Sequence, residues 1–87
     1  MELKRGQLVK NTGAKTFRLA IISRVWQSKP SFSPQVEVIW IHYPAHPEMV
    51  GKTTQMDSRR FANVAPGLAG YVIVQDETGK PVPPFER

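Results

Sequence analysis

Hydrophobic and polar residues alternate along residues 18–26 and 35–43, as they do in β-strands that bury one face. Both segments are rich in β-branched residues, which also favours strands over helices. In the first segment Arg18 and Arg24 mark the polar face, and in the second Glu37 does. The opposite faces predict a core that contains Leu19, Ile21, Val25, Val36, Val38 and Trp40.

Shorter apolar stretches and turn-forming residues extend this pattern to an all-β chain. Strands are expected at residues 7–10 and 52–56, and a loop with two prolines at 29–34 joins the two long strands. A single helical turn is expected near residues 57–62, because Asp57 or Ser58 can cap it and Phe61 can point inward. Val64 is expected in a last short strand. Residues 71–82 are expected to form a hairpin or a strand with a returning tail, and the prolines that follow should be extended.

From about residue 4 to residue 65 this order resembles the Src-homology-3-like small β-barrels, which include Tudor-type and ribosomal KOW-type modules. The matching features are the opening residues Gly6, Leu8 and Val9, two long central strands, a shorter fourth strand and a one-turn helix that carries Phe61. The resemblance covers roughly 60 of the 87 residues. It implies a five-stranded barrel over residues 1–66. Residues 67–87 have no counterpart in the minimal barrel, and we expect them to pack on it as a C-terminal hairpin or tail. The resemblance also implies a binding module and leaves the ligand open.

The second face of the two long strands is apolar as well. A small barrel has room for one buried face, so these side chains need a β-bulge, a cover from the C-terminal tail, or another protein. If another protein covers this face, we expect the interface to contain Ile22, Ile39, Ile41 and Tyr43, with Trp26 on the same face.

Positive charge is concentrated in the first third of the chain. Twelve Lys and Arg residues against seven Asp and Glu give a net charge of +5, and the residues up to Lys29 alone carry seven basic groups and one acid, Glu2. Such a field favours nucleic acid or an acidic protein surface, although it can also serve solubility alone. Aromatic residues lie between the cations, so the sequence predicts a surface for nucleic acid or another polyanion that contains Lys10, Lys15, Phe17, Arg18, Arg24 and Trp26.

The absence of cysteine rules out a disulfide framework and a thiolate metal cluster, and it fits a cytoplasmic setting or one within a phage or virus assembly. Every apolar run is far shorter than the ~20 residues that span a bilayer. The N-terminal residues lack the apolar stretch of a signal peptide. We therefore expect neither a membrane span nor export.

Three motifs that could carry chemistry do not reach a complete site. Gly51, Lys52 and Thr53 match the end of a phosphate-binding loop, but His46 stands where that loop needs its first glycine. Pro44 and Pro47 exclude a helix that would bring His42 and His46 together around a metal. No serine comes with a recognisable base and oxyanion hole. We therefore expect no cofactor, no metal and no catalysis, with an enzyme assembled from several copies as a remote alternative.

The sequence thus predicts a non-enzymatic interaction module whose basic third binds nucleic acid or another acidic partner. The alternative is a structural subunit of a larger assembly, such as a phage component or a homo-oligomer, that uses the face of Ile39, Ile41 and Tyr43.

Overall fold

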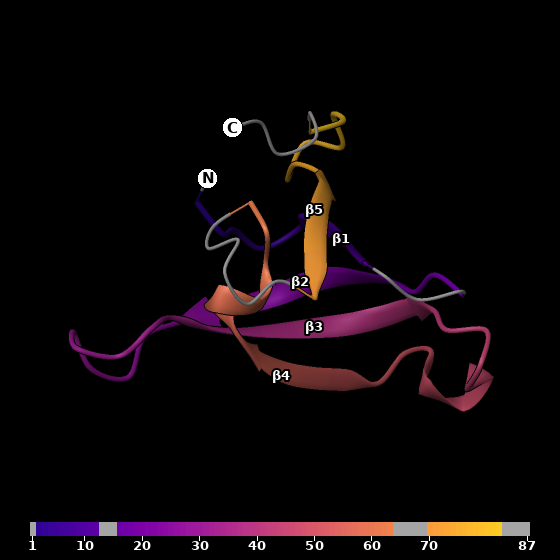
Figure 1. Cartoon of the computed structure of the whole chain (residues 1–87), viewed down its shortest axis with the longest axis horizontal. Coiled ribbons are helices and arrows are strands. Elements are labelled where there is room, and N and C mark those ends of the chain that lie inside the picture. Colours follow the sequence, from indigo (N-terminus) through magenta and orange to yellow (C-terminus); the bar gives the residue numbers. More distant parts are fainter. Residues whose placement is uncertain (1, 13–15, 64–69, 83–87) are drawn as a thin grey trace.

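The strands expected from the alternating pattern form one antiparallel sheet in the computed structural model, which describes residues 2–12, 16–63 and 70–82. The strand order is β4-β3-β2-β1-β5 (Figure 1). The strands are β1 (Leu8–Asn11), β2 (Leu19–Trp26), β3 (Gln35–His42), β4 (Thr53–Asp57) and β5 (Tyr71–Gln75). Two short 3-10 turns, η1 (Pro47–Met49) and η2 (Ser58–Arg60), are the helical elements of the described residues. The all-β class and the single helical turn after the fourth strand are confirmed.

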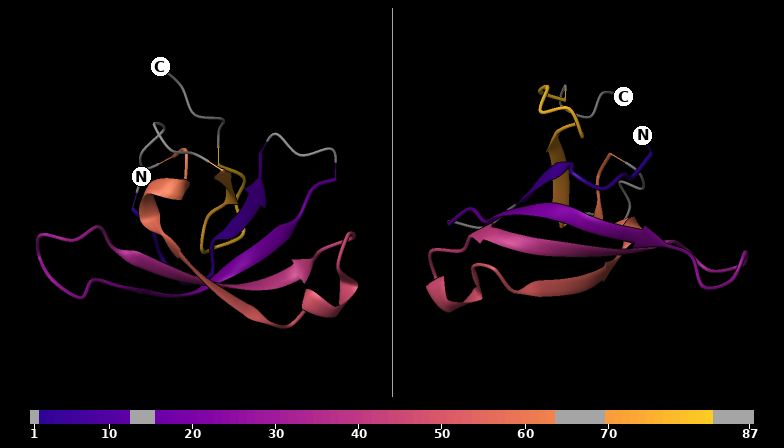
Figure 2. Two further views of the ribbon diagram at one scale, coloured as in Figure 1. Left: turned by 60° about the horizontal axis from the view of Figure 1, so that its bottom comes forward. Right: turned by 180° about the vertical axis from the view of Figure 1, so that it is seen from behind.

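The sheet is strongly curved, so that its two ends face each other across a small core. Strands β2, β3 and β4 form a curved layer, and β5 rises steeply from it beside β1 (Figures 1 and 2). Residues after η2 return alongside the start of β5, where Phe61 and Tyr71 form a parallel bridge and the Ala62 N–H donates to the Tyr71 carbonyl at 2.8 Å. The sheet therefore approaches a barrel without closing into one.

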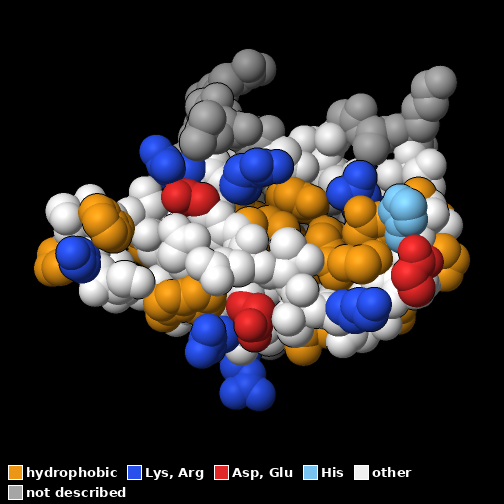
Figure 3. All heavy atoms as spheres, turned by 90° about the horizontal axis from the view of Figure 1, so that it is seen from below, with side chains coloured by type: hydrophobic (Ala, Val, Ile, Leu, Met, Phe, Trp, Pro, Cys, Tyr) orange, Lys and Arg blue, Asp and Glu red, His pale blue; other side chains and the backbone are white. Residues whose placement is uncertain are grey.

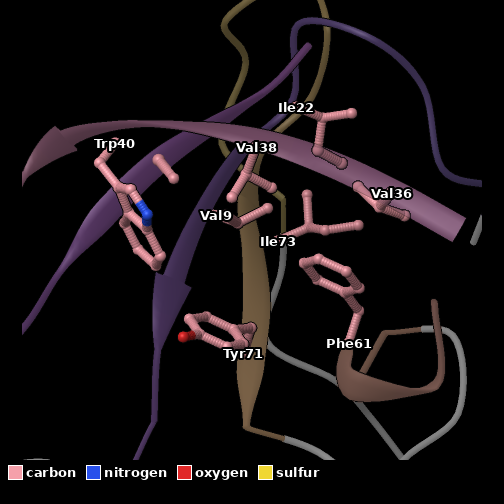
Figure 4. Close-up of a cluster of buried hydrophobic side chains, with 9 residues drawn as sticks. Val9, Ile22, Val36, Val38, Trp40, Phe61, Tyr71 and Ile73 are labelled. Carbon is pink, nitrogen blue, oxygen red and sulfur yellow. The ribbon is translucent and has the colours of Figure 1, made fainter. Parts of the chain in front are cut away.

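The core lies between the curved layer and β5. Phe61 points from the end of η2 toward the side chains of the strands (Figure 4). The buried apolar residues are Val9, Ala20, Ile22, Val36, Val38, Trp40, Phe61, Tyr71 and Ile73. The predicted core positions Val36, Val38 and Trp40 are confirmed, and Val25 packs against this cluster while half-buried.

The prediction that Leu19 and Ile21 lie in the core is wrong, and a β-bulge in β2 is the reason. Ile22 pairs with Val38 and Arg24 pairs with Glu37, which leaves Ser23 as an extra residue without a partner on β3. An extra residue exchanges the faces on either side of it, because side chains alternate with a period of two. The Ser23 hydroxyl lies 3.1 Å from the Glu37 carbonyl oxygen and 2.9 Å from its carboxylate, so it holds the bulge by hydrogen bonding.

The C-terminal hairpin is present, and its first strand is also the fifth strand of the sheet. Val9 in β1 pairs with Ile73 in β5, and Ile73 enters the common core. The chain then turns through Asp76, whose carboxylate accepts from Thr78 and Lys80, and returns so that the Val82 N–H donates to the Val74 carbonyl at 3.0 Å. The strand expected at Val64 and the proline-rich end lie outside the described residues.

Phe61 is expected to be a principal contributor to stability, because it is fully buried where the two ends of the sheet meet. Phe61→Ala should lower the free energy of unfolding by about 3–5 kcal/mol, through lost burial and the cavity left behind. Phe32→Ala is the matched control, since Phe32 is exposed and its truncation should cost less than about 0.5 kcal/mol. Urea unfolding followed by tryptophan fluorescence measures both values, and equal losses would contradict this assignment of the core.

Asp57 caps η2 and should make stability depend on pH. Hydrogen bonds from the side chain and then the backbone N–H of Arg59 lower the pKa of Asp57 below its ordinary value. A lowered folded-state pKa gives stability that is complete above the unfolded value near 4 and is lost as pH falls through the folded value.

The free energy of unfolding of the Asp57→Ala variant should therefore lie about 1 kcal/mol below that of the wild type at pH 7. That difference should shrink toward zero at low pH, because protonation removes the charge of Asp57 from the wild type, whereas the variant has no carboxylate at this position at any pH. The pKa values of Asp76 and Glu77 are also lowered, but these groups are present in both proteins and cancel in the difference. Urea unfolding across pH measures the difference, and a value that stays constant would show that the carboxylate charge at Asp57 does not matter.

Candidate binding surface on the outer face of the sheet

The face of β1, β2 and β3 that points away from the core, here called the outer face, combines apolar, aromatic and basic side chains. Residues that pair directly across antiparallel strands share a face. Figure 3 shows apolar side chains gathered on the side of the molecule away from β5, with basic side chains around them. The pairs on the outer face are Lys10 with Leu19, Leu19 with His42, Ile21 with Ile39, Arg24 with Glu37 and Trp26 with Gln35.

One end of the outer face carries an exposed pair of stacked rings. Phe17 is 45% exposed, and its ring stacks on His42 with 4.7 Å between centroids and 27° between planes. The Lys10 ammonium lies 5.4 Å from the centre of the Phe17 ring. Asn11 fixes this region, because its side chain accepts from the Arg18 N–H at 2.7 Å and donates to the Thr16 carbonyl at 3.3 Å. Phe17 is thus held between two anchored neighbours.

The Arg18 side chain lies at the same end, over the ring of Tyr43 at 4.7 Å from its centre. Tyr43 itself packs edge-on against Trp40, with 5.0 Å between centroids and an interplanar angle of 75°. Tyr43 is therefore half-buried against the core and does not extend the outer face beyond Ile39 and Ile41.

The other end of the outer face carries a second group of rings and cations. The Arg24 guanidinium lies 4.3 Å from the centre of the Trp26 ring. In the following loop the Lys29 ammonium lies 5.5 Å from the ring of Phe32, which is 54% exposed. The Gln27 side chain donates to the Phe32 carbonyl at 2.6 Å, and the Phe32 N–H donates to the Lys29 carbonyl at 3.0 Å. These bonds order the loop that presents Phe32.

Acidic groups do not neutralise these cations. Lys10, Arg18, Arg24 and Lys29 form no ion pair with a carboxylate within residues 2–12, 16–63 and 70–82. The carboxylates of the same residues are engaged elsewhere: Glu2 and Glu77 with Lys4, Glu37 with Ser23, Glu48 with His46, Asp57 with Arg59, and Asp76 with Thr78. Positive charge on the outer face is therefore available to a ligand.

An apolar strip separates the two charged ends. Ile21, Ile39 and Ile41 are 36%, 37% and 43% exposed, and Ile21 and Ile39 are direct cross-strand partners. The predicted position of Ile39 and Ile41 on the face opposite the core is confirmed. The interface assigned to Ile22 is wrong, because the bulge at Ser23 turns Ile22 into the core, where it is fully buried.

The residues predicted to hold a polyanion thus divide between the two ends. Lys10, Phe17 and Arg18 come together at one end and Arg24 with Trp26 at the other, while Lys15 lies outside the described residues. Sequence reasoning missed His42, whose contact with Phe17 depends on strand pairing. It also missed Lys29 and Phe32, although a cation three residues before an aromatic in a short loop was a usable signal.

Comparison with protein-family models, curated proteins and solved structures finds no match to this chain. In the described part of the chain, no helix has the length and apolarity to cross a membrane, and no cluster of His, Asp and Glu side chains could hold a metal ion. The chemistry of the outer face is therefore the basis for a functional proposal.

Adjacent isoleucines on opposite faces of β2 offer a direct test of the bulge. Ile22→Asp should prevent folding, because it buries an unpaired charge in the core. Ile21→Asp should leave the chain folded, because its side chain reaches solvent on the outer face. Circular dichroism and urea unfolding of the two variants measure the difference. A folded Ile22→Asp variant, or an unfolded Ile21→Asp variant, would contradict the assigned faces.

Proposed function

We propose that this protein is a non-enzymatic module that binds single-stranded nucleic acid on the outer face of β1, β2 and β3. One observation carries the proposal. Each of four cations on or beside this face lies over an aromatic ring and lacks a carboxylate partner in the described residues. These cations are Lys10, Arg18, Arg24 and Lys29. A protein surface on which cations alternate with aromatic rings matches a nucleic acid strand, in which phosphates alternate with bases.

The existing contacts can be exchanged for contacts with a ligand. A cation over a ring at an exposed site contributes about 0.5–1 kcal/mol. Stacking of a base on an aromatic side chain contributes about 1–3 kcal/mol, and each phosphate contact releases counterions. The flexible Lys10 side chain can therefore leave Phe17 for a phosphate while a base takes its place on the ring.

The rings favour nucleic acid over an acidic protein segment. A polyacidic segment would use the cations alone and would leave the exposed surfaces of Phe17 and Phe32 uncovered. Single strands are favoured over duplexes, because only unpaired bases offer their faces for stacking.

The fold supports this proposal without specifying it. The strand order, with a 3-10 turn between the fourth and fifth strands, is consistent with membership of the Src-homology-3-like superfamily, which we also propose. Such small barrels serve as binding modules with varied ligands.

A second candidate is a structural subunit that associates through the apolar strip. The exposure of Ile21, Ile39 and Ile41 beside one another favours it, because apolar patches on small proteins often mark contacts. Tyr43, packed against Trp40, does not belong to that strip.

Binding to a fluorescent oligothymidylate should be measurable at low salt and should weaken steeply as salt is added. Replacing Lys10, Arg18 and Arg24 together by alanine should lower affinity by at least about tenfold and reduce the salt slope by about 2, since each phosphate contact on a single strand contributes about 0.7. Anisotropy titrations at several salt concentrations measure both quantities.

The matched control replaces Arg5, Arg60 and Lys80 by alanine, which removes the same charge from positions outside the outer face. Equal losses in the two triple variants would contradict a defined surface. Displacement of the oligonucleotide by polyglutamate at equal charge concentration would instead favour an acidic protein. No binding at low salt, together with a mass above 9.8 kDa in light scattering, would favour the structural subunit.

A further inference from the structure

The two most exposed aromatic rings of the described residues lie beyond opposite ends of β2. Phe17 lies two residues before the strand, with His42 and Lys10 beside it, and we call this group the Phe17 station. Phe32 lies in the loop after the strand, close in sequence to Trp26, and we call Arg24, Trp26, Lys29 and Phe32 the Phe32 station. The loop of residues 27–34 extends well beyond the ends of β2 and β3 (Figure 1, left).

The length of β2 sets a lower limit to the distance between the stations, because Phe17 and Phe32 both lie beyond its ends. The strand has eight residues, and at about 3.3 Å per residue its ends lie about 23 Å apart. Stacked nucleotides on one strand rise about 3.4 Å each, so about seven stacked nucleotides span this distance. An oligonucleotide of four nucleotides is too short to reach both stations in that form.

The Phe32 station is prepared for binding before a ligand arrives. Hydrogen bonds from Gln27 and from the Phe32 N–H hold the loop, and Pro30 and Pro34 restrict its backbone. An aromatic side chain presented on an ordered loop loses little conformational entropy when it binds. Phe32 is therefore positioned as a contact residue rather than as a disordered loop tip.

The apolar strip between the stations provides no charge for phosphates. Ile21 and Ile39 form its centre as cross-strand partners. A ligand is thus held electrostatically at the ends of the strand and contacts aliphatic surface in the middle.

We infer that the Phe17 station and the Phe32 station act together as the two ends of one site, which takes a single strand of about seven or more nucleotides. This inference rests on the proposed function. Joining two weak sites through one ligand raises affinity without a new contact, because binding at the second site becomes intramolecular. Short oligonucleotides use one station at a time.

The test uses two oligonucleotides of equal length and charge. One has twelve positions with four thymines at each end and four abasic positions between them, and the other has four thymines at one end followed by eight abasic positions. Both carry the same phosphates, so they differ only in whether the second end carries four thymines or four abasic positions. Anisotropy titration should give at least about tenfold tighter binding for the two-ended oligonucleotide.

Variants at each station complete the experiment. Phe17→Ala and Phe32→Ala should each reduce this ratio to about two, the statistical factor for a ligand with two equivalent ends. Val50→Ala is the matched control, because Val50 is a similarly exposed apolar residue outside both stations and its loss should leave the ratio unchanged.

The outcomes separate this inference from the proposed function. A wild-type ratio of about two with measurable binding, or a larger ratio that neither Phe variant changes, overturns the two-station site and leaves the nucleic-acid surface standing. Failure of both oligonucleotides to bind at low salt overturns the proposed function, and the inference with it.

Discussion

The extra residue at Ser23 determines which side of β2 is inside the molecule. Before the bulge Ala20 and Ile22 face the core, and after it Val25 does. The strand therefore contributes side chains to the core along its whole length, although the alternation of inward and outward side chains shifts by one residue at Ser23. Glu37 on β3 stabilises the bulge through the Ser23 hydroxyl. The same shift places Ile21, Arg24 and Trp26 on the outer face. The core and much of the candidate surface therefore depend on this irregularity, while a second register shift, between Leu19 and Ala20, places His42 opposite Leu19.

A chain of 87 residues has little apolar surface to bury, and the curvature of its single sheet gathers that surface into one core. Phe61 fills the space where the two ends of the sheet approach, and its bridge to Tyr71 joins the end of η2 to β5. Because one small core takes one face of the sheet, the remaining isoleucines stay on the outer face. The apolar strip is thus a consequence of the fold and is available for function.

The placement of charge separates the outer face from the rest of the surface. Carboxylates in the described residues bond to Lys4, Arg59, His46, Ser23 and Thr78, whereas the cations of the outer face contact aromatic rings. The contact of a cation with a ring is weak in water, so the cation can readily exchange it for a contact with a phosphate. An acidic residue beside Arg24 could have neutralised it, yet Glu37, its cross-strand partner, bonds to Ser23 instead.

The sequence by itself determined the class of the fold, the places of the strands and the helical turn that carries Phe61. These follow from local rules: alternation, β-branched residues, a capping Asp57 and turn-forming prolines act over a few neighbouring residues. The concentration of positive charge in the first third of the chain also followed from the sequence alone. Tertiary structure alone decided which face of β2 is buried, since a bulge at Ser23 has meaning only against β3. It also decided that Phe17 stacks on His42, and that the basic residues form two groups at opposite ends of one strand, because such contacts join residues that are distant along the chain.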